Sequence, residues 1–267
     1  MKRHIPNNGE PFKLLVEVQA SLPVELILYG YEANLANTVH FFRQYGDANV
    51  AEVGKFQGIH SFEFPFPKPV EKLKIEVFDK NAGSSSGIKI RSIKYSPLVL
   101  PVRVTFASHV QEYIDFAFDF AHDCGFSDVG NYESSSGLYT IVFADFVRSW
   151  EHKTNDIIYT PARVNHATGI VEVSKHYFDQ LTITNRFMIL LHEFTHFYFN
   201  TKIEIECDMI ACNICLMLGF SKTECLYAIS RLFDHCGTDK QCEAFIERKE
   251  KIIDFIQNWT NNYETNI

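Results

Sequence analysis

The stretch Thr182-Ile-Thr-Asn-Arg-Phe-Met-Ile-Leu-Leu-His-Glu-Phe-Thr-His-Phe-Tyr-Phe-Asn200 carries the most information about this chain. It is apolar on nearly every side after its first turn, which predicts a buried helix. Its motif His192-Glu-Phe-Thr-His196 places two imidazoles four residues apart on one helix face, where both reach one metal ion. The pattern therefore predicts a metal-binding helix with His192 and His196 as ligands.

Glu193 follows the first of these histidines, and there its carboxylate reaches a water activated by the metal. Three ionisable groups inside an apolar helix are costly to bury without partners. A bound Zn²⁺ removes that cost, because imidazole and carboxylate are ordinary zinc ligands. The alternative is a pair of hydrogen-bonded core histidines beside a buried acid.

A catalytic zinc ion usually has three protein ligands and one open position, so a third ligand is needed. The metzincin continuation of the motif is absent, because its Gly and His positions hold Phe199 and Lys202. After a break at residues 200–202, the segment Ile203-Glu-Ile-Glu-Cys-Asp-Met-Ile-Ala211 predicts a second helix. That helix is the expected source of the third ligand.

Two acidic residues of this second helix, Glu204 and Asp208, are four apart and share a face, whereas Glu206 points elsewhere. With Glu204-Ile-Glu-Cys-Asp208, the chain resembles the gluzincin branch of the zincin metallopeptidases, which pairs His-Glu-x-x-His with a downstream Glu-x-x-x-Asp. The resemblance covers about a third of the chain. It implies that Glu204 is the third zinc ligand and that Asp208 accepts a hydrogen bond from a ligand histidine. Glu206 and Asp208 are alternative ligands if the helix begins later.

The resemblance implies a zinc metalloendopeptidase that acts on a peptide or protein substrate, with Glu193 as the general base. A further group must stabilise the oxyanion, and His166, Tyr198 and His235 are the candidates, with no choice made among them. Residues 163–174 have a turn-like centre and then an alternating strand. We expect this hairpin to face substrate as an edge strand; an ordinary supporting hairpin is the alternative.

Two other functions remain open. One is a structural or assembly protein, for example a phage virion component, that retains a zincin fold as a scaffold. The intact Glu193 favours the enzyme, because a metal held only for stability does not need a base. The other is a non-catalytic zinc site closed by a fourth protein ligand such as Glu206 or Cys207.

The first hundred residues predict a different architecture from the rest. Short runs rich in Val, Ile and Phe, separated by Pro, Gly, Asn or Ser, predict strands at residues 12–20, 24–30, 50–56, 72–78 and 88–95. Such spacing indicates an antiparallel β-sandwich module over residues 1–96. Prolines at both ends of residues 96–101 predict a linker there.

From residue 107 the pattern becomes helical, and residues 102–267 are predicted to form a minimal zincin-like metallopeptidase domain. Apolar spacing predicts a helix at 109–124, and residues 137–146 predict a strand. Capping boxes at Ser221 and Thr238 predict two closing helices. The fold class expected for the whole chain is α+β.

Composition limits the remaining functions. The formal net charge of −8 argues against nucleic-acid binding. The N-terminal residues lack the apolar core of a secretory signal, and no apolar run is long enough to span a membrane. The seven cysteines are odd in number and lie mostly at helical positions, which favours reduced thiols. We therefore expect a soluble cytoplasmic protein, or alternatively a virion-associated one, whose N-terminal module contacts a protein partner.

Overall fold

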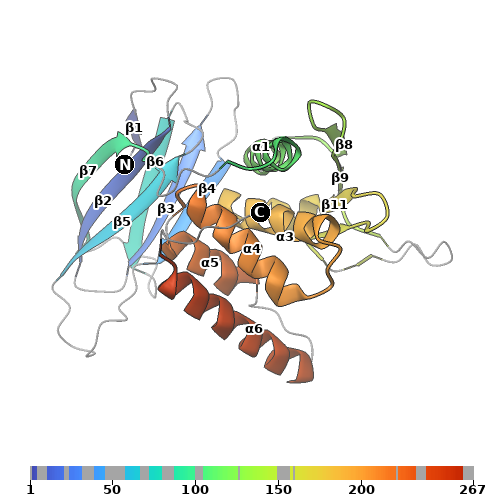
Figure 1. Cartoon of the computed structure of the whole chain (residues 1–267). Coiled ribbons are helices and arrows are strands. Elements are labelled where there is room, and N and C mark those ends of the chain that lie inside the picture. The colour runs from blue at the N-terminus through green and yellow to red at the C-terminus, as the bar shows by residue number, and fades with distance from the viewer. Residues whose placement is uncertain are drawn as a thin grey trace. The chain divides into compact units, whose positions relative to one another are not determined.

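The computed structural model describes residues 2–4, 11–20, 24–31, 39–45, 58–66, 72–79, 87–99, 105–125, 127–148, 157–158, 160–220, 222–232 and 239–260. The fold is mixed α+β, as expected (Figure 1). The chain divides into two compact units, Met1–Pro101 with Leu216–Tyr227 and Val102–Cys215 with Ala228–Ile267. No pattern in the sequence indicates that Leu216–Tyr227 belongs with the first unit.

The first unit contains two antiparallel sheets in its described part, with strand orders β1-β6-β3-β4 and β5-β2-β7. The strands are β1 (Lys2–His4), β2 (Phe12–Ala20), β3 (Val24–Tyr31), β4 (Val39–Tyr45), β5 (Gly58–Phe66), β6 (Lys72–Asp79) and β7 (Lys89–Pro97). Every second residue of β2 is buried, and the register sets Leu14 opposite Phe64. The rings of Phe12 and Phe66 stack with centroids 4.7 Å apart. An alternating strand thus presents one apolar face to a core.

Two expectations for the first unit need correction. The predicted linker starts too early, because β7 continues through Pro97, which pairs with Phe12. Proline is tolerated there because β7 is an edge strand of its sheet among the described strands, and its missing N–H removes no ladder bond to β2. The sequence pattern also missed β1, β4 and β5. The strand predicted at 50–56 lies outside the described residues.

The second unit combines one mixed sheet with helices. The sheet has strand order β10-β11-β9-β8, and only β9 and β11 run parallel. Its strands are β8 (Gly130–Glu133), β9 (Thr140–Ala144), β10 (Ala162–Val164) and β11 (Val171–Ser174). The helices are α1 (Ser108–Asp123), α2 (Lys175–Phe178), α3 (Ile183–Tyr198), α4 (Glu204–Met217), the end of α5 (Lys222–Leu232), and α6 (Asp239–Asn258).

These elements differ from the predicted ones in a few places. The strand predicted at 137–146 is shorter, because Gly137 has a φ of 77° and closes the turn between β8 and β9. Neither β8 nor α2 was predicted. The two predicted caps, Ser221 and Thr238, lie outside the described residues, although α5 and α6 begin directly after them.

Helix α3 contacts α1 and the strands β10 and β11, and it is buried as its apolar sequence predicts. Phe194 stacks on Tyr113 with ring centroids 4.0 Å apart, and the Tyr113 hydroxyl donates to the carbonyl of Leu190 at 2.8 Å. Burial of an aromatic pair with its hydroxyl satisfied fixes the rotation of α3 about its axis. This packing determines which face of α3 is left for the histidines.

None of the described helices combines the length and the apolar character that a bilayer crossing requires.

Candidate metal centre

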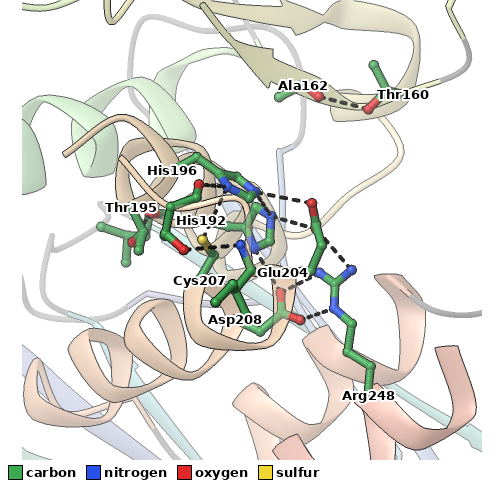
Figure 2. Close-up of polar contacts among 12 residues, drawn as sticks. Thr160, Ala162, His192, Thr195, His196, Glu204, Cys207, Asp208 and Arg248 are labelled. Carbon is green, nitrogen blue, oxygen red and sulfur yellow. Dashed lines mark hydrogen bonds and ion pairs between the residues drawn. The ribbon is translucent and has the colours of Figure 1, made fainter. Parts of the chain in front are cut away.

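Helix α3 begins at a side-chain cap and carries both predicted histidines on one face. The Thr182 side chain accepts a hydrogen bond from the backbone N–H of Asn185 at the N-terminus of α3. Three turns later, His192 and His196 point the same way, with their Nε2 atoms 3.0 Å apart (Figure 2). The i, i+4 spacing therefore brings the two imidazoles together as predicted.

The predicted break after α3 brings Glu204 back to the histidines. Asn200 has a φ of 48°, a left-handed conformation that ends the helix. The chain reverses, and α4 starts with Glu204. Its Oε2 lies 3.3 Å from His192 Nε2, and its Oε1 lies 3.4 Å from His196 Nε2. The three side chains thus offer ligand atoms that all lie within 4.8 Å of one another.

The other nitrogen of each ring has its own partner, and these partners set the tautomers. His192 Nδ1 lies 2.8 Å from Asp208 Oδ1, and His196 Nδ1 lies 2.8 Å from the carbonyl oxygen of Thr201. Carboxylate and carbonyl oxygens only accept hydrogen bonds, so each Nδ1 carries the proton. In the neutral rings, both Nε2 lone pairs then point at one spot beside Glu204.

This donor set fits a zinc ion. Ligands about 2.0–2.1 Å from a tetrahedral zinc ion lie about 3.3 Å from one another. The two Nε2 atoms are 3.0 Å apart, and Glu204 approaches His192 Nε2 with Oε2 at 3.3 Å and His196 Nε2 with Oε1 at 3.4 Å. With one ligand atom taken from each residue, all three atoms lie within 4.8 Å of one another, close enough to share one ion after small side-chain adjustments. Two imidazoles and one carboxylate are also the ligand types of a catalytic zinc site with an open position.

The charges at the cluster are coupled. Burial disfavours the protonated ring of His192, but its contacts with Asp208 and Glu204 outweigh burial and raise its pKa. The hydrogen bond with His192 lowers the pKa of Glu204. The two carboxylates therefore hold a positive charge between them. A metal ion bound here would replace that proton.

Glu193 lies beside the cluster on the side of strand β10. Burial raises the pKa of its carboxyl group, against the effects of the two imidazoles and of a hydrogen bond from the backbone N–H of Val164. That N–H belongs to β10, an edge strand of its sheet as far as the described residues extend. The predicted base is thus held against a strand edge, next to the three candidate ligands.

The structure does not bring the alternative ligands to the cluster. Glu206 accepts a hydrogen bond from the Thr201 hydroxyl at 3.2 Å, on the exposed surface. The Sγ atom of Cys207 lies 3.3 Å from Nδ1 of His196, on the opposite edge of the ring from Nε2. Asp208 also contacts an Nδ1 atom, that of His192. None of the three faces the Nε2 atoms.

The three candidates for oxyanion stabilisation are now distinguished by position. The exposed ring of His166, in the turn between β10 and β11, meets the ring of His196 edge-on at 5.9 Å. The Tyr198 hydroxyl instead pairs with His109 Nε2 at 3.1 Å, beside α1. His235 lies outside the described residues. Only His166 is placed next to the cluster among the described candidates.

One residue at this site was missed by sequence reasoning. Arg248 of α6 contacts Glu204 and Asp208 of α4, with Nη1 3.0 Å from Glu204 Oε2 and Nη2 2.8 Å from Asp208 Oδ1 (Figure 2). Its Nε also donates to Asp208 Oδ2. The only usable signal was a basic residue among the polar positions of the last helix, which does not distinguish Arg248 from its neighbours Lys249 and Lys251.

Comparison of the chain with protein-family models, with curated proteins and with solved structures found no match.

Proposed function

We propose that this protein is a zinc-dependent peptidase whose second unit is a zincin-like domain and whose first unit is a β-sandwich. The convergence of His192, His196 and Glu204, which offer one ligand atom each within 4.8 Å of one another, carries the proposal. The intact Glu193 beside them favours catalysis over a purely structural site. When bound, zinc would acidify a water molecule and polarise the peptide carbonyl.

The residues of the chain supply the remaining steps. Glu193 takes the proton from the attacking water and returns it to the leaving amine. Its raised pKa, caused mainly by burial, brings it closer to neutral pH and suits a base that must later act as an acid. His166, exposed beside His196, donates to the developing oxyanion.

Strand β10 provides a place for the substrate backbone. The N–H of Asn165 bonds to Ile170, and the carbonyl of Pro161 accepts from Ser174, so the odd-numbered residues of β10 face β11. Ala162 and Val164 therefore direct their backbone groups to the other edge. There the Val164 N–H bonds to Glu193 and the Ala162 carbonyl accepts from the Thr160 hydroxyl at 2.7 Å, so a substrate strand would use the Ala162 N–H and the Val164 carbonyl. A peptide that adds to this edge as a further strand would lie next to Glu193.

We also propose that the protein works in a reducing compartment such as the cytoplasm. The five cysteines whose surroundings are described, Cys124, Cys207, Cys212, Cys215 and Cys225, are all buried thiols outside any disulfide. Buried thiols of this kind are typical of intracellular proteins.

The decisive experiment combines metal analysis with a general protease assay on the full chain. We expect one zinc per wild-type chain, and loss of that zinc in both His196→Ala and Glu204→Ala. Glu193→Gln should keep the zinc and lose nearly all hydrolysis of fluorescein-labelled casein. Unchanged hydrolysis in Glu193→Gln would exclude the mechanism. Stoichiometric zinc without hydrolysis of any peptide pool by the wild type would favour the scaffold function instead.

A further inference from the structure

Helix α6 contacts the candidate zinc site through Arg248. The guanidinium group uses Nε and Nη2 on the two oxygens of Asp208, a bidentate pair, and Nη1 on Glu204 Oε2. Asp208 is 5% exposed at its side chain and Arg248 is 18% exposed. Such a planar fork fixes the direction of both carboxylates at once, which a lysine ammonium does not do.

The two carboxylates have different needs for this contact. Asp208 is buried and also accepts from His192 Nδ1, so its position is fixed from two sides. The side chain of Glu204 is 53% exposed and stands at the first turn of α4. An exposed glutamate loses rotamer freedom when it is held in one direction. Arg248 Nη1 lies 3.0 Å from Glu204 Oε2, the same oxygen that lies 3.3 Å from His192 Nε2, so Arg248 acts together with the imidazole in directing Glu204.

Resting on the proposed zinc site, we propose that Arg248 is a positioning residue that holds Glu204 and Asp208 in the arrangement required for metal binding. The site is then assembled from three helices, α3, α4 and α6, rather than from the two that carry the ligands. The affinity for zinc depends on a residue that does not touch the metal.

A cation next to a metal site also repels the metal, so the two effects of Arg248 oppose each other. The bidentate pair with Asp208 already offsets the charge of Arg248, which reduces this repulsion. When Arg248 is removed, the contact that directs Glu204 is lost, and the pair with Asp208 does nothing to replace it. We therefore expect positioning to dominate.

The test measures the affinity of the full-length protein for Zn²⁺ alone, by competition with a chromophoric chelator, and needs no substrate. Arg248→Met should bind Zn²⁺ about 10- to 100-fold more weakly than wild type. The matched control is Lys251→Met on the same helix, which breaks only the exposed ion pair with Glu247 at 2.6 Å. It should bind Zn²⁺ within twofold of wild type.

Two further measurements separate positioning from folding. Arg248→Lys keeps the charge and most of the volume, yet its single ammonium cannot make the same three contacts, so it should also bind weakly. The visible spectrum of the Co²⁺-loaded protein should change in both Arg248 variants and not in Lys251→Met. Circular dichroism with excess chelator identifies a variant that does not fold. If Arg248→Met does not fold, the comparison of Arg248→Lys with wild type decides the question.

The outcomes for this inference and for the proposed function are distinct. If wild type binds no zinc, or if His196→Ala binds as well as wild type, the zinc site itself is wrong. If wild type binds zinc and Arg248→Lys matches it in affinity and in Co²⁺ spectrum, only the role of Arg248 is wrong.

Discussion

At the scale of single residues, the hydrogen-bond acceptors behind the two imidazoles decide which ring nitrogens can bind a metal ion. Asp208 and the Thr201 carbonyl hold the Nδ1 protons, and so both Nε2 atoms are available as ligands. The motif predicts the two rings but not their tautomers, which depend on whatever the chain places behind them.

His166 gives a prediction about rate. Replacing it with alanine should lower kcat for peptide hydrolysis by about 100-fold, because one donor to the oxyanion is lost. Zinc affinity should stay within twofold of wild type. The control is His176→Ala, another exposed histidine, whose ring contacts Phe146 at 4.9 Å. Equal rates for the two variants would show that His166 has no role in the reaction.

Cys124 gives a prediction about pH. Burial raises the pKa of its thiol to about 11, well above the ordinary value for cysteine. The reactive thiolate is a small minority below the pKa, so at pH 8 the native thiol is almost fully protonated. Iodoacetamide at pH 8 should therefore modify Cys124 only after unfolding in denaturant, as followed by peptide mass spectrometry. Rapid modification of the native protein would contradict its burial.

At the scale of elements, the helices were easier to predict than the strands. Periodicity located α1 and α3 to within two residues at each end, because an amphipathic or buried helix repeats its apolar pattern over several turns. The short strands β1, β8 and β10 hold three or four residues each, too few for a clear alternation. Their pairing depends on partners distant in the sequence.

The turn between β10 and β11 gives a prediction about stability. Gly169 has a φ of 73°, and an added Cβ would lie 2.8 Å from the ring of Phe197 on α3. Gly169→Ala should cost about 1–2 kcal/mol for the left-handed backbone, plus about 1–3 kcal/mol for overpacking. The control is Gly137→Ala, with a φ of 77° and open space around the added Cβ, which should show only the backbone cost.

Urea unfolding of both glycine variants measures the difference. If the two variants lose the same free energy of unfolding, the added Cβ at Gly169 meets no steric obstacle, which would contradict the close approach of Phe197. A larger loss in Gly169→Ala supports the close approach of this turn to Phe197 on α3.

At the scale of the whole molecule, all three candidate ligands belong to the second unit. A ligand that binds only the native state stabilises it, by about 4 kcal/mol at a thousand times its dissociation constant. We expect chelation of zinc to lower the unfolding temperature of the second unit in scanning calorimetry. None of these three candidate ligands belongs to the first unit, so we expect its transition to stay in place. His196→Ala lacks one of the three ligands, so chelation should leave its unfolding temperature unchanged. A fall as large as that of wild type would contradict the proposed site.

The sequence alone determined the features that depend on local spacing. These are the pair His192 and His196 at i, i+4, the adjacent Glu193, and the pair Glu204 and Asp208 on the next helix. Helix geometry converts a spacing of four residues into a shared face without help from the rest of the chain. Such features follow from the order of the residues by itself.

Only the tertiary structure decided which groups surround that motif. It brings Arg248 to Asp208 across forty positions of sequence, and it sets the N–H of Val164 against Glu193. It also turns Cys207 and Glu206 away from the Nε2 atoms. These contacts come from packing of apolar faces between distant segments. The hydrophobic effect that drives this packing has no preferred partner, so a local sequence pattern does not predict which distant segments meet.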